Sequence, residues 1–297
     1  MDNEYDRLDE ALDKYHVQLS QRVINENIIY HYTSYEGLKG ILSSQKLRFT
    51  DYKFLNDPTE IEYCKKIILD EMYNHDLGSK NFHLINQFFN QLDAMYKIYI
   101  SCFSENNKLS LWRYYADNGA GFALGFGKNF FQPSKENDDP LAPTVCEIIY
   151  GEKAKEMVAG FFKQFCKVYP TPEEKDRCIN RLLVHFIRIL PALKHESFQD
   201  EEEIRICYTE GELLGKYFNN ADRDFIQIKE EDIPFVNVLK GKKPIVTPEV
   251  FQKRDIVEIL VGPRCNFIEA RTSVQCILQD NGYSSEIPIR SASLPFQ

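Results

Sequence analysis

Two glutamates and an arginine in one short segment are the residue types in this chain best suited to chemistry. The segment reads Asp200-Glu201-Glu202-Glu203-Ile204-Arg205-Ile206-Cys207-Tyr208. If residues 200–208 form a strand, alternate side chains point to opposite faces. Every second residue from Ile204 then enters an apolar layer, whereas Glu201, Glu203 and Arg205 share the other face. Carboxylates placed in this way can stabilise a developing positive charge, and a nearby guanidinium favours their ionised form.

Two interpretations of this acidic face are open. Acidic residues are uncommon in strands, and charged side chains are seldom buried unless they are paired. The face therefore belongs either to a solvated edge strand, in which Arg205 is an ion-pair partner, or to a functional cleft. Candidate residues elsewhere in the chain bear on this choice.

A histidine lies where a strand is expected to run into a helix. The extended segment 28–34 contains His31, and Thr33 and Glu36 have the spacing of a capping box for a helix over 35–44. Free backbone N–H groups gather at such a corner, which makes it a common place to hold a ligand. The alternative is a structural histidine that bonds to the backbone.

The clearest local signal is the start of a helix. Asp57 fits an N-cap, Pro58 the first helical position and Glu60 the return partner of a capping box. A helix of about five turns is expected to follow, through Tyr73. This role accounts for the three residues without any function and leaves Asn56 unexplained.

Aromatic residues gather in the middle of the chain. A short helix over 110–116 carries Trp112, the only tryptophan, and Tyr115. Side chains at this spacing form either part of a core or a flat wall against which a ring stacks. The strand expected over 122–126 has only small residues on one face, so a backbone or a flat ligand can approach it closely.

Composition and charge exclude several classes of protein. The chain has 297 residues, 43% of them hydrophobic, which is enough for a sizeable core. A formal net charge of -9 argues against broad binding to duplex nucleic acid. The eight cysteines form no CxxC pair and no metal-ligand spacing, so we expect reduced thiols, no metal and a cytoplasmic location. No apolar run approaches the ~20 residues of a membrane span.

The remaining pattern predicts the elements that position these residues. Helices are expected over 4–24, 82–96, 153–168, 172–193 and 266–280. Strands are expected over 98–103, 122–126, 146–150, 224–229, 235–239, 256–261 and near 284–290, with loops at 132–142 and 240–244. Strands and helices do not alternate strictly, which disfavours a doubly wound parallel sheet. We predict an α+β protein in which a helix in residues 1–25 packs on a single mixed domain of residues 26–297.

An ordered set of motifs resembles a bacterial family known as domain of unknown function 2971. The motifs are His31-Tyr32-Thr33-Ser34, Leu55-Asn56-Asp57-Pro58-x-Glu60, Ser101-x-Phe103-Ser104-Glu105, Leu111-Trp112-x-x-Tyr115-Ala116, Gly119-x-Gly121-Phe122-Ala123, Phe198-x-x-Glu201-x-Glu203-x-Arg205 and Ile259-x-Val261-Gly262-Pro263. The resemblance runs from about residue 28 to 290. Position 204 is Ile where an aromatic residue is expected, and the acidic motif is intact.

A looser resemblance, in layout, is to ADP-ribosyltransferases that use NAD. Those enzymes share a histidine at the end of a first strand, aromatic residues in a middle segment and a late strand bearing a glutamate. The resemblance implies split β-sheets flanked by helices, NAD as the substrate, and an acceptor that is a protein or a nucleic acid. A role in bacterial conflict or phage defence is a further expectation.

The resemblance also implies residue roles. Glu203 would bind the ribose 2′-hydroxyl and stabilise an oxocarbenium-like transition state, while Glu201 orients the acceptor. Arg205 would keep Glu203 ionised, and His31 would donate to a ribose hydroxyl. The other NAD-binding candidates are Tyr32, Thr33, Ser34, Arg48, Asn56, Trp112 and Tyr115. Arg48 would contact the diphosphate, Asn56 would hold a loop over the site, and Trp112 or Tyr115 would stack on nicotinamide.

Three functional interpretations follow. The first is an NAD-dependent ADP-ribosyltransferase or NAD glycohydrolase. The second is a non-catalytic module that binds a nucleotide or nucleic acid in the same cleft. The third is an interaction protein whose acidic segment forms a salt-bridge network, in which loss of Glu203 or Arg205 lowers the melting temperature without affecting any ligand.

Overall fold

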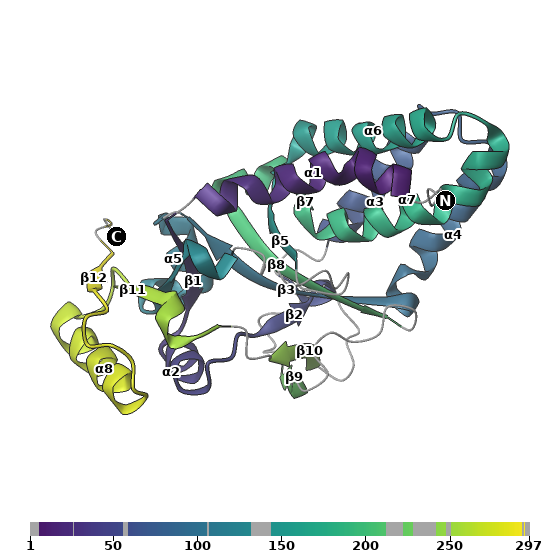
Figure 1. Cartoon of the computed structure of the whole chain (residues 1–297). Helices are drawn as coiled ribbons and strands as arrows, with labels where there is room; N and C mark the ends of the chain where they lie inside the picture. The colour runs from purple at the N-terminus through teal and green to yellow at the C-terminus, as the bar shows by residue number, and fades with distance from the viewer. Residues whose placement is uncertain are drawn as a thin grey trace.

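The fold is mixed α+β, as the sequence predicted, with helices on both faces of a mixed sheet (Figure 1). The computed structural model describes residues 6–25, 27–55, 59–105, 107–131, 144–211, 222–227, 242–247, 251–292 and 294. The segments expected as a loop at 132–142 and a strand at 235–239 lie outside these residues, as does Asn56.

The helices are amphipathic and mostly follow the predicted ranges. They are α1 (Asp6–Asn25), α2 (Tyr35–Ser44), α3 (Glu60–Met72), α4 (Ser79–Met95), α5 (Leu109–Tyr115), α6 (Gly151–Val168), α7 (Pro172–Ile189) and α8 (Phe267–Asp280). Short 3-10 helices include η1 (Tyr52–Phe54), η4 (Leu190–Ala192) and η5 (Glu196–Glu201).

One sheet contains nearly all the strands. Its members are β1 (Ile28–Thr33), β2 (Phe49–Asp51), β3 (Tyr96–Ser104), β4 (Phe122–Gly127), β5 (Thr144–Glu147), β8 (Glu203–Gly211), β9 (Asp222–Gln227), β10 (Lys242–Thr247), β11 (Ile256–Val261) and β12 (Ile289–Ser291). Among the described residues of this sheet, only β11 and β12 pair in parallel, and the other ladders are antiparallel. β6 (Ile149–Tyr150) and β7 (Leu193–Lys194) form a separate parallel pair.

The sheet divides along one edge of β3. β8 pairs with β3 over its whole length, from Tyr96 to Ser104, and occupies one edge. The other edge is shared, because β2 pairs at Tyr99 and Ile100 whereas β1 pairs only at Ser104. Beyond β1 the sheet continues through β4, β11 and β12, and beyond β2 through β10 and β9. We call the point between β1 and β2, at residues 101–103, the fork.

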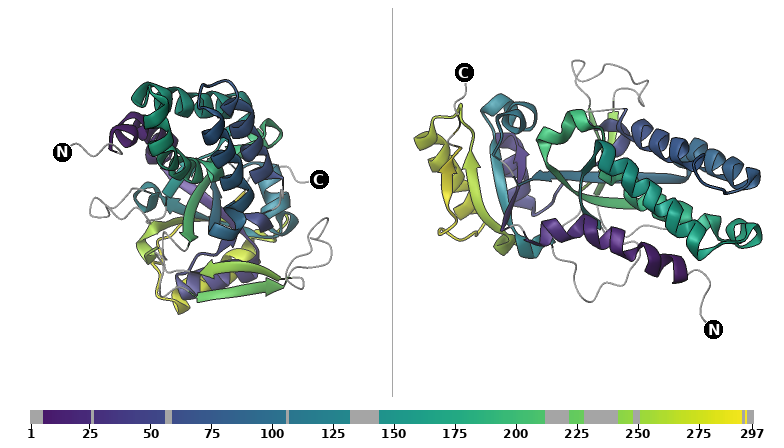
Figure 2. Two further views of the ribbon diagram at one scale, coloured as in Figure 1. Left: turned by 90° about the vertical axis from the view of Figure 1, so that its right-hand side faces the viewer. Right: turned by 90° about the horizontal axis from the view of Figure 1, so that it is seen from above.

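Hydrophobic cores lie on both faces of this sheet. On one face α1, α3, α4, α6 and α7 cover β3, β8 and β5 (Figure 2). The core on this face includes the buried side chains of Phe161, Phe186 and Ile98. On the other face α2 and α8 pack on Tyr99, Phe103 and their neighbours. A small third cluster lies under α5, where Trp112 contacts Tyr32. The fork therefore lies between the large helical layer and α5.

Several predicted boundaries are wrong for identifiable reasons. The helix predicted over 172–193 ends at Ile189, because Pro191 cannot continue it, and residues 193–194 form β7. The N-cap of α2 is Ser34, whose side chain accepts a hydrogen bond from Gly37 N, and not Thr33. The loop predicted at 240–244 overlaps β10, which begins at Lys242 and is paired with both β2 and β9.

Candidate functional site

Two adjoining cavities lie at the fork, of about 80 and 110 Å³. Both are lined by Cys102, Tyr115, Glu201 and Glu203. The first extends to His31 and the second to the ion-paired side chains described below. We call the two together the fork pocket. Residues from β1, β3, α5, η5 and β8 meet there, although they are far apart in the sequence.

A larger open groove of about 940 Å³ lies elsewhere, between α1, β6 and the start of α6. None of the sequence-predicted site residues lines it. The fork pocket is smaller, but it is where buried ionisable groups converge, and perturbed ionisable groups in a pocket mark functional sites. We therefore treat the fork pocket as the candidate site.

Arg205 is the centre of the polar contacts. It is buried, and its five N–H groups all donate to acceptors. Nε and Nη2 donate to the two carboxylate oxygens of Glu203, each at 2.8 Å. Nη1 and Nη2 donate to the two oxygens of Glu60, and Nη1 also donates to Pro191 O at 2.9 Å. This pattern anchors β8 to α3 and to the turn after α7.

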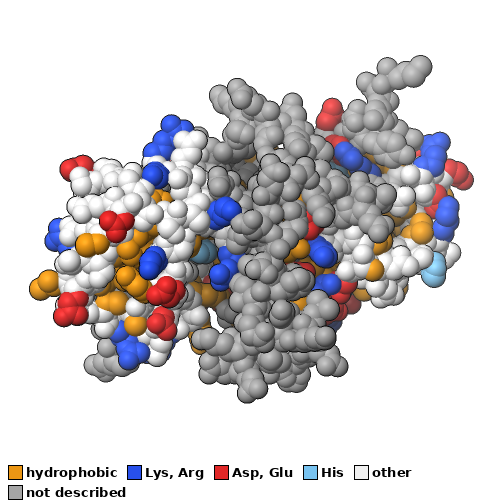
Figure 3. Space-filling model, turned by 90° about the horizontal axis from the view of Figure 1, so that it is seen from below, with side chains coloured by type: hydrophobic (Ala, Val, Ile, Leu, Met, Phe, Trp, Pro, Cys, Tyr) orange, Lys and Arg blue, Asp and Glu red, His pale blue; other side chains and the backbone are white. Residues whose placement is uncertain are grey.

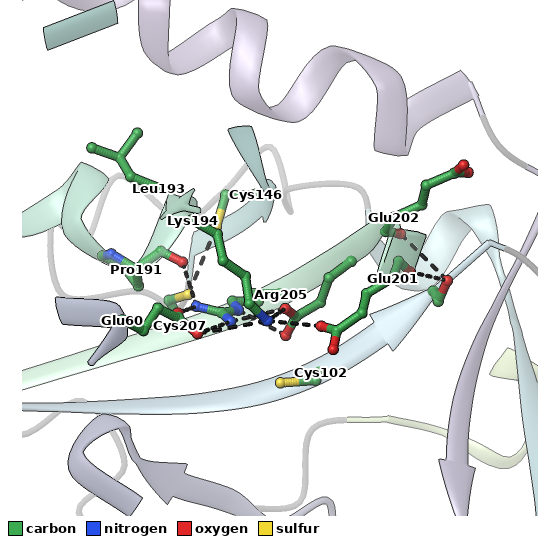
Figure 4. Close-up of polar contacts among 12 residues, drawn as sticks. Glu60, Cys102, Cys146, Pro191, Leu193, Lys194, Glu201, Glu202, Arg205 and Cys207 are labelled. Atoms are coloured by element: carbon green, nitrogen blue, oxygen red, sulfur yellow. Dashed lines mark hydrogen bonds and ion pairs between the residues drawn. The ribbon is translucent and has the colours of Figure 1, made fainter. Parts of the chain in front are cut away.

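Lys194 is a second buried cation in the same group. Its Nζ donates to Glu201 Oε2 at 2.7 Å and to Glu203 Oε2 at 3.0 Å, and lies 3.6 Å from Glu60 Oε2. Figure 4 shows the ends of Lys194 and Arg205 converging with Glu60 and Glu201 above β3 and β8. We call these five residues the ion cluster. Three carboxylates face two cations, so the ion cluster has one formal negative charge in excess.

The buried ion pairs keep the cluster ionised. Burial alone would raise the pKa of Glu203, but the charges of Arg205 and Lys194 bring it down to about 2. Burial would likewise lower the pKa of Lys194, yet the charges of Glu203, Glu60 and Glu201 raise it. Burial would also lower the pKa of Arg205, but the charges of Glu203 and Glu60 raise it. Glu203 is therefore a carboxylate near neutral pH, as the proximity of Arg205 suggested.

Glu201 and Glu203 reach the pocket by a route different from the predicted one. Strand β8 begins at Glu203, and Glu201 is the last residue of η5. Between them Glu202 has a left-handed conformation, with φ of 41°, which turns the chain. The two acidic side chains converge because of this turn and not because of strand alternation. From Ile204 the alternation holds, with Ile204, Ile206 and Tyr208 in the core under α2 and α8.

Glu201 is the more accessible carboxylate, with 15% of its side chain exposed against 8% for Glu203. Its Oε1 accepts a hydrogen bond from Tyr115 Oη at 3.1 Å, and its backbone oxygen accepts from Ser104 Oγ at 2.9 Å. Burial, followed by the charges of Glu201 and Glu203, raises the pKa of Tyr115, so the phenol remains a donor. The edge-strand interpretation of Glu201 and Glu203 as solvated residues is wrong, because β8 lies between β3 and β5.

His31 crosses the fork to the edge of β3. Its Nδ1 lies 2.9 Å from the backbone oxygen of Cys102, and a carbonyl can only accept, so Nδ1 carries the proton. Burial lowers the pKa of His31, and the charge of Arg48 lowers it further, so the ring is neutral. Nε2 is then an acceptor. The resemblance implied a histidine that donates to a ligand, whereas this tautomer accepts.

The other predicted residues fall into two groups. Tyr32 lines the fork pocket, and Arg48 is exposed, with its charge close enough to affect His31. Trp112 is fully buried, and its Nε1 donates a hydrogen bond to Asn107 Oδ1 at 2.6 Å. Its ring packs edge-on against Tyr32, so Trp112 is a core residue and not a stacking surface for a ligand. Thr33 packs under Gly37 in the first turn of α2, and Ser34 caps that helix.

Cys102 lines both cavities but is a poor nucleophile. Burial, with a further contribution from the charge of Glu203, raises its pKa well above the usual range. A thiol in this state is protonated near neutral pH, and the thiolate is the reactive form. The geometry therefore points away from cysteine-based hydrolysis at this pocket.

Sequence reasoning missed Lys194 and the role of Glu60. Glu60 was explained as part of a helix cap, but its carboxylate binds Arg205. Lys194 was overlooked because it follows a segment predicted as helix. A lysine directly after the apolar run Ile189-Leu190-Pro191-Ala192-Leu193, seven residues before Glu201, was the available signal. A charge at the end of such a run is buried only when it is paired.

Comparison with known proteins supports one resemblance in part. The profile of a family described as protein of unknown function (DUF2971) matches residues 111–206, about a third of the chain. The matched part includes most of α5, all of η5 and the start of β8, and hence Tyr115, Glu201, Glu203 and Arg205. No curated protein and no solved structure matches the chain. The similarity thus covers Glu201, Glu203 and Tyr115 of the fork pocket, whereas His31, Glu60 and Cys102 lie outside the matched range.

The described part of the chain shows neither a metal site nor a membrane-spanning helix. Among the residues that the structure describes, no group of histidine, cysteine and acidic side chains is arranged to hold a metal ion. In the same part of the chain, no helix is long and apolar enough to cross a membrane.

Proposed function

We propose that the fork pocket binds NAD and cleaves the bond between nicotinamide and ribose, transferring ADP-ribose to an acceptor or to water. The observation that carries this proposal is the convergence of His31, Tyr115, Glu201 and Glu203 on one pocket, from three separate segments of the chain. A neutral acceptor, a phenol and two carboxylates suit a substrate that offers hydroxyl groups and develops positive charge.

The size of the pocket limits what enters it. Cavities of about 80 and 110 Å³ accept one ring at a time and not a whole dinucleotide. Only the reacting end of NAD would lie at the fork, with the diphosphate towards the exposed Arg48. Among the described residues no acidic side chain forms an ion pair with Arg48, which leaves its guanidinium available to a phosphate.

The residue roles follow from exposure and existing bonds. Glu201 is assigned to face the substrate, because its side chain is 15% exposed against 8% for Glu203. In addition, both oxygens of Glu203 are held by the Arg205 cation, whereas Oε1 of Glu201 is held only by a neutral phenol. The carboxylate of Glu201 would stabilise the oxocarbenium-like transition state, as in glycoside hydrolysis. His31 Nε2 would accept a hydrogen bond from a ribose hydroxyl. Tyr115 and Tyr32 would form the walls beside the nicotinamide ring.

The test is release of nicotinamide from NAD by the purified full-length chain and by Glu201→Gln. The variant removes the charge but keeps the shape, so we expect at least about 100-fold slower release. Its melting temperature should stay within about 3 °C of the wild type. The matched control is Glu202→Gln, whose carboxylate pairs with Lys108 at 2.7 Å and not with the ion cluster. It should retain wild-type activity.

Wild-type rates in Glu201→Gln would contradict the assigned role. Absence of nicotinamide release by the wild type, together with no rise in melting temperature on adding NAD, would contradict the function itself. An active enzyme that lacks its acceptor would still be stabilised by NAD, because a ligand that binds the folded state raises its stability.

The second candidate is a non-catalytic module that binds a nucleotide in the same pocket. It is favoured by one observation, namely that every oxygen of Glu203 and Glu201 already has a donor. It predicts that NAD raises the melting temperature without nicotinamide release, equally in wild type and Glu201→Gln. On the described part of the face in Figure 3, basic and acidic side chains are interspersed, which does not favour a nucleic-acid groove.

A further inference from the structure

Lys194 is held in place from several directions. It belongs to the two-residue strand β7, which pairs in parallel with β6, and its preceding residue Leu193 is fully buried. Lys194 itself is 4% exposed. Its Nζ lies 4.8 Å from the centre of the Phe198 ring, so an aromatic face lies beside the charge. The ammonium group therefore has little freedom to move.

The Arg205 contacts would be complete without this lysine. Arg205 satisfies both oxygens of Glu203 and both oxygens of Glu60, and its last donor is taken by Pro191 O. What Lys194 adds is the ion pair with Glu201, at 2.7 Å. Among the described residues, Lys194 is the cation that links Glu201 to Glu203.

Glu201 depends on that link for its direction. It lies outside the sheet, at the end of η5, and is followed by the turn at Glu202. Its side chain has two anchors, Lys194 on Oε2 and the phenol of Tyr115 on Oε1. A single neutral hydrogen bond contributes roughly 1 kcal/mol, too little to fix a partly exposed carboxylate against solvation.

We propose that Lys194 is the positioning residue of the fork pocket, whose ammonium group holds the Glu201 carboxylate towards the ligand. This inference rests on the proposed function for its kinetic consequence, but its geometric claim stands without a substrate. The groups that face Nζ are Glu60 from α3, Glu201 from η5, Glu203 and Arg205 from β8, and the Phe198 ring. Methionine at position 194 has a similar length and no charge, while arginine restores a cation.

The experiment compares wild type with Lys194→Met and Lys194→Arg in two ways. Crystal structures show the direction of the Glu201 side chain without any ligand. We expect it to leave the pocket in Lys194→Met and to return in Lys194→Arg. In steady-state assays of nicotinamide release, kcat should fall about 100-fold in Lys194→Met, while KM for NAD should change far less. In Lys194→Arg, kcat should be at least about 10-fold higher than in Lys194→Met. Lys155→Met, at an exposed lysine outside the ion cluster, should match wild type in both.

Each outcome decides one claim. A Glu201 side chain that keeps its direction in Lys194→Met overturns the positioning role, as does a kcat close to wild type. Equal loss of kcat in Lys194→Met and Lys194→Arg, with both folded, also overturns it, because a positioning cation must be replaceable by another. If Lys194→Met does not fold, Lys194→Gln takes its place. A wild type without NAD cleavage refutes the proposed function, while the crystal structures still decide the role of Lys194.

Discussion

At the scale of single residues, the ion cluster shows how several charges are buried together. Arg205 uses all five donors, and its partners come from α3, β8 and the turn after α7. A buried ion pair adds little stability compared with apolar residues, but its disruption leaves a charge that water cannot reach. Removal of Arg205 should therefore lower the free energy of unfolding by much more than the intact ion pairs add to it.

The first prediction concerns Arg205→Met. This change leaves Glu60 and Glu203 facing each other with only Lys194 between them, and should lower the free energy of unfolding by about 3–5 kcal/mol. Urea denaturation at neutral pH measures it. The control, Lys80→Ala, breaks the pair with Asp176 in which the lysine side chain is 65% exposed, and should cost at most ~1 kcal/mol. Similar losses in the two variants would contradict the buried pairing.

Sequence reasoning found the residues of the site better than their contacts. Residue type and position were enough to select Glu201, Glu203, Arg205, His31 and Tyr115. All of these except Arg205 line the same cavity. Their partners were harder to predict. Glu60 comes from α3, 145 residues before Arg205 in the chain. Lys194 is only nine residues before Glu203, but it directly follows a segment that was predicted to be helical. Trp112 could not be separated from Tyr115 either, since burial depends on which side of a short helix meets the sheet.

At the scale of elements, local signals specified most helices and strands, and turns decided the exceptions. The end of α7 at Pro191 and the left-handed Glu202 replace one long helix and one long strand by shorter pieces. These two irregular turns position Lys194 and Glu201. Periodicity predicts regular elements well, but it says little about a site built on their interruptions.

The second prediction separates capping from ligand binding at Ser34. Its side chain accepts from Gly37 N at 3.2 Å, so Ser34→Ala should lower the free energy of unfolding by about 1 kcal/mol. Nicotinamide release should be unchanged if the serine only caps α2. Thr171→Ala, which breaks the capping box with Glu174 at the start of α7, is the matched control for stability. A large loss of NAD affinity in Ser34→Ala would instead assign the residue to the pocket.

The third prediction concerns the contact between α1 and α7. His16 Nε2 lies 3.0 Å from His185 Nδ1, and His185 Nε2 lies 3.0 Å from Asp9 Oδ1, which also pairs with Arg181. Burial, with the charges of His185 and Arg188, lowers the pKa of His16 to about 4, and burial lowers that of His185 despite Asp9. Asp9 keeps a lowered pKa, because Arg181 and His185 outweigh its burial.

The direction in which stability changes with pH follows from the unfolded chain, where a histidine titrates near its usual pKa of 6.5. Below that pH the unfolded state binds protons that the folded state does not, so stability is complete above it and falls as the pH decreases towards 4. The slope should reach roughly 1 kcal/mol per pH unit for each histidine. Urea denaturation between pH 7.5 and 4.5 measures it. His16→Gln should flatten the curve, whereas the exposed His83→Gln should leave it unchanged.

At the scale of the whole molecule, the helical layer and the sheet bury half of the eight thiols. Cys64, Cys146, Cys178 and Cys207 are buried, and Cys146 Sγ lies 3.7 Å from Cys207 Sγ. Cys276 is exposed on α8, next to residues of the same helix that are buried in the core. The composition of the chain predicted reduced buried thiols, but the sequence could not show which cysteine faces solvent.

The fourth prediction is the order in which the cysteines react. Under native conditions at pH 8, iodoacetamide should modify Cys276 first, while the four buried thiols react only after unfolding. Peptide mass spectrometry at timed intervals measures this order. Cys102 should also react slowly, because burial and Glu203 raise its pKa. Rapid modification of Cys102 would contradict the protonated thiol at the fork.

The shared edge of β3 has a consequence for how the chain acquires its structure during synthesis. β3 cannot be completed on its other edge until β8 has been made, and β4 waits for β11, near the end of the chain. The early strands therefore leave the ribosome with unpaired edges, and the pairings that close them are among the most distant in the sequence. Topologies of this kind fold slowly and expose strand edges to aggregation. The candidate site takes residues from β1 to β8, so it can form only after β8 has been made.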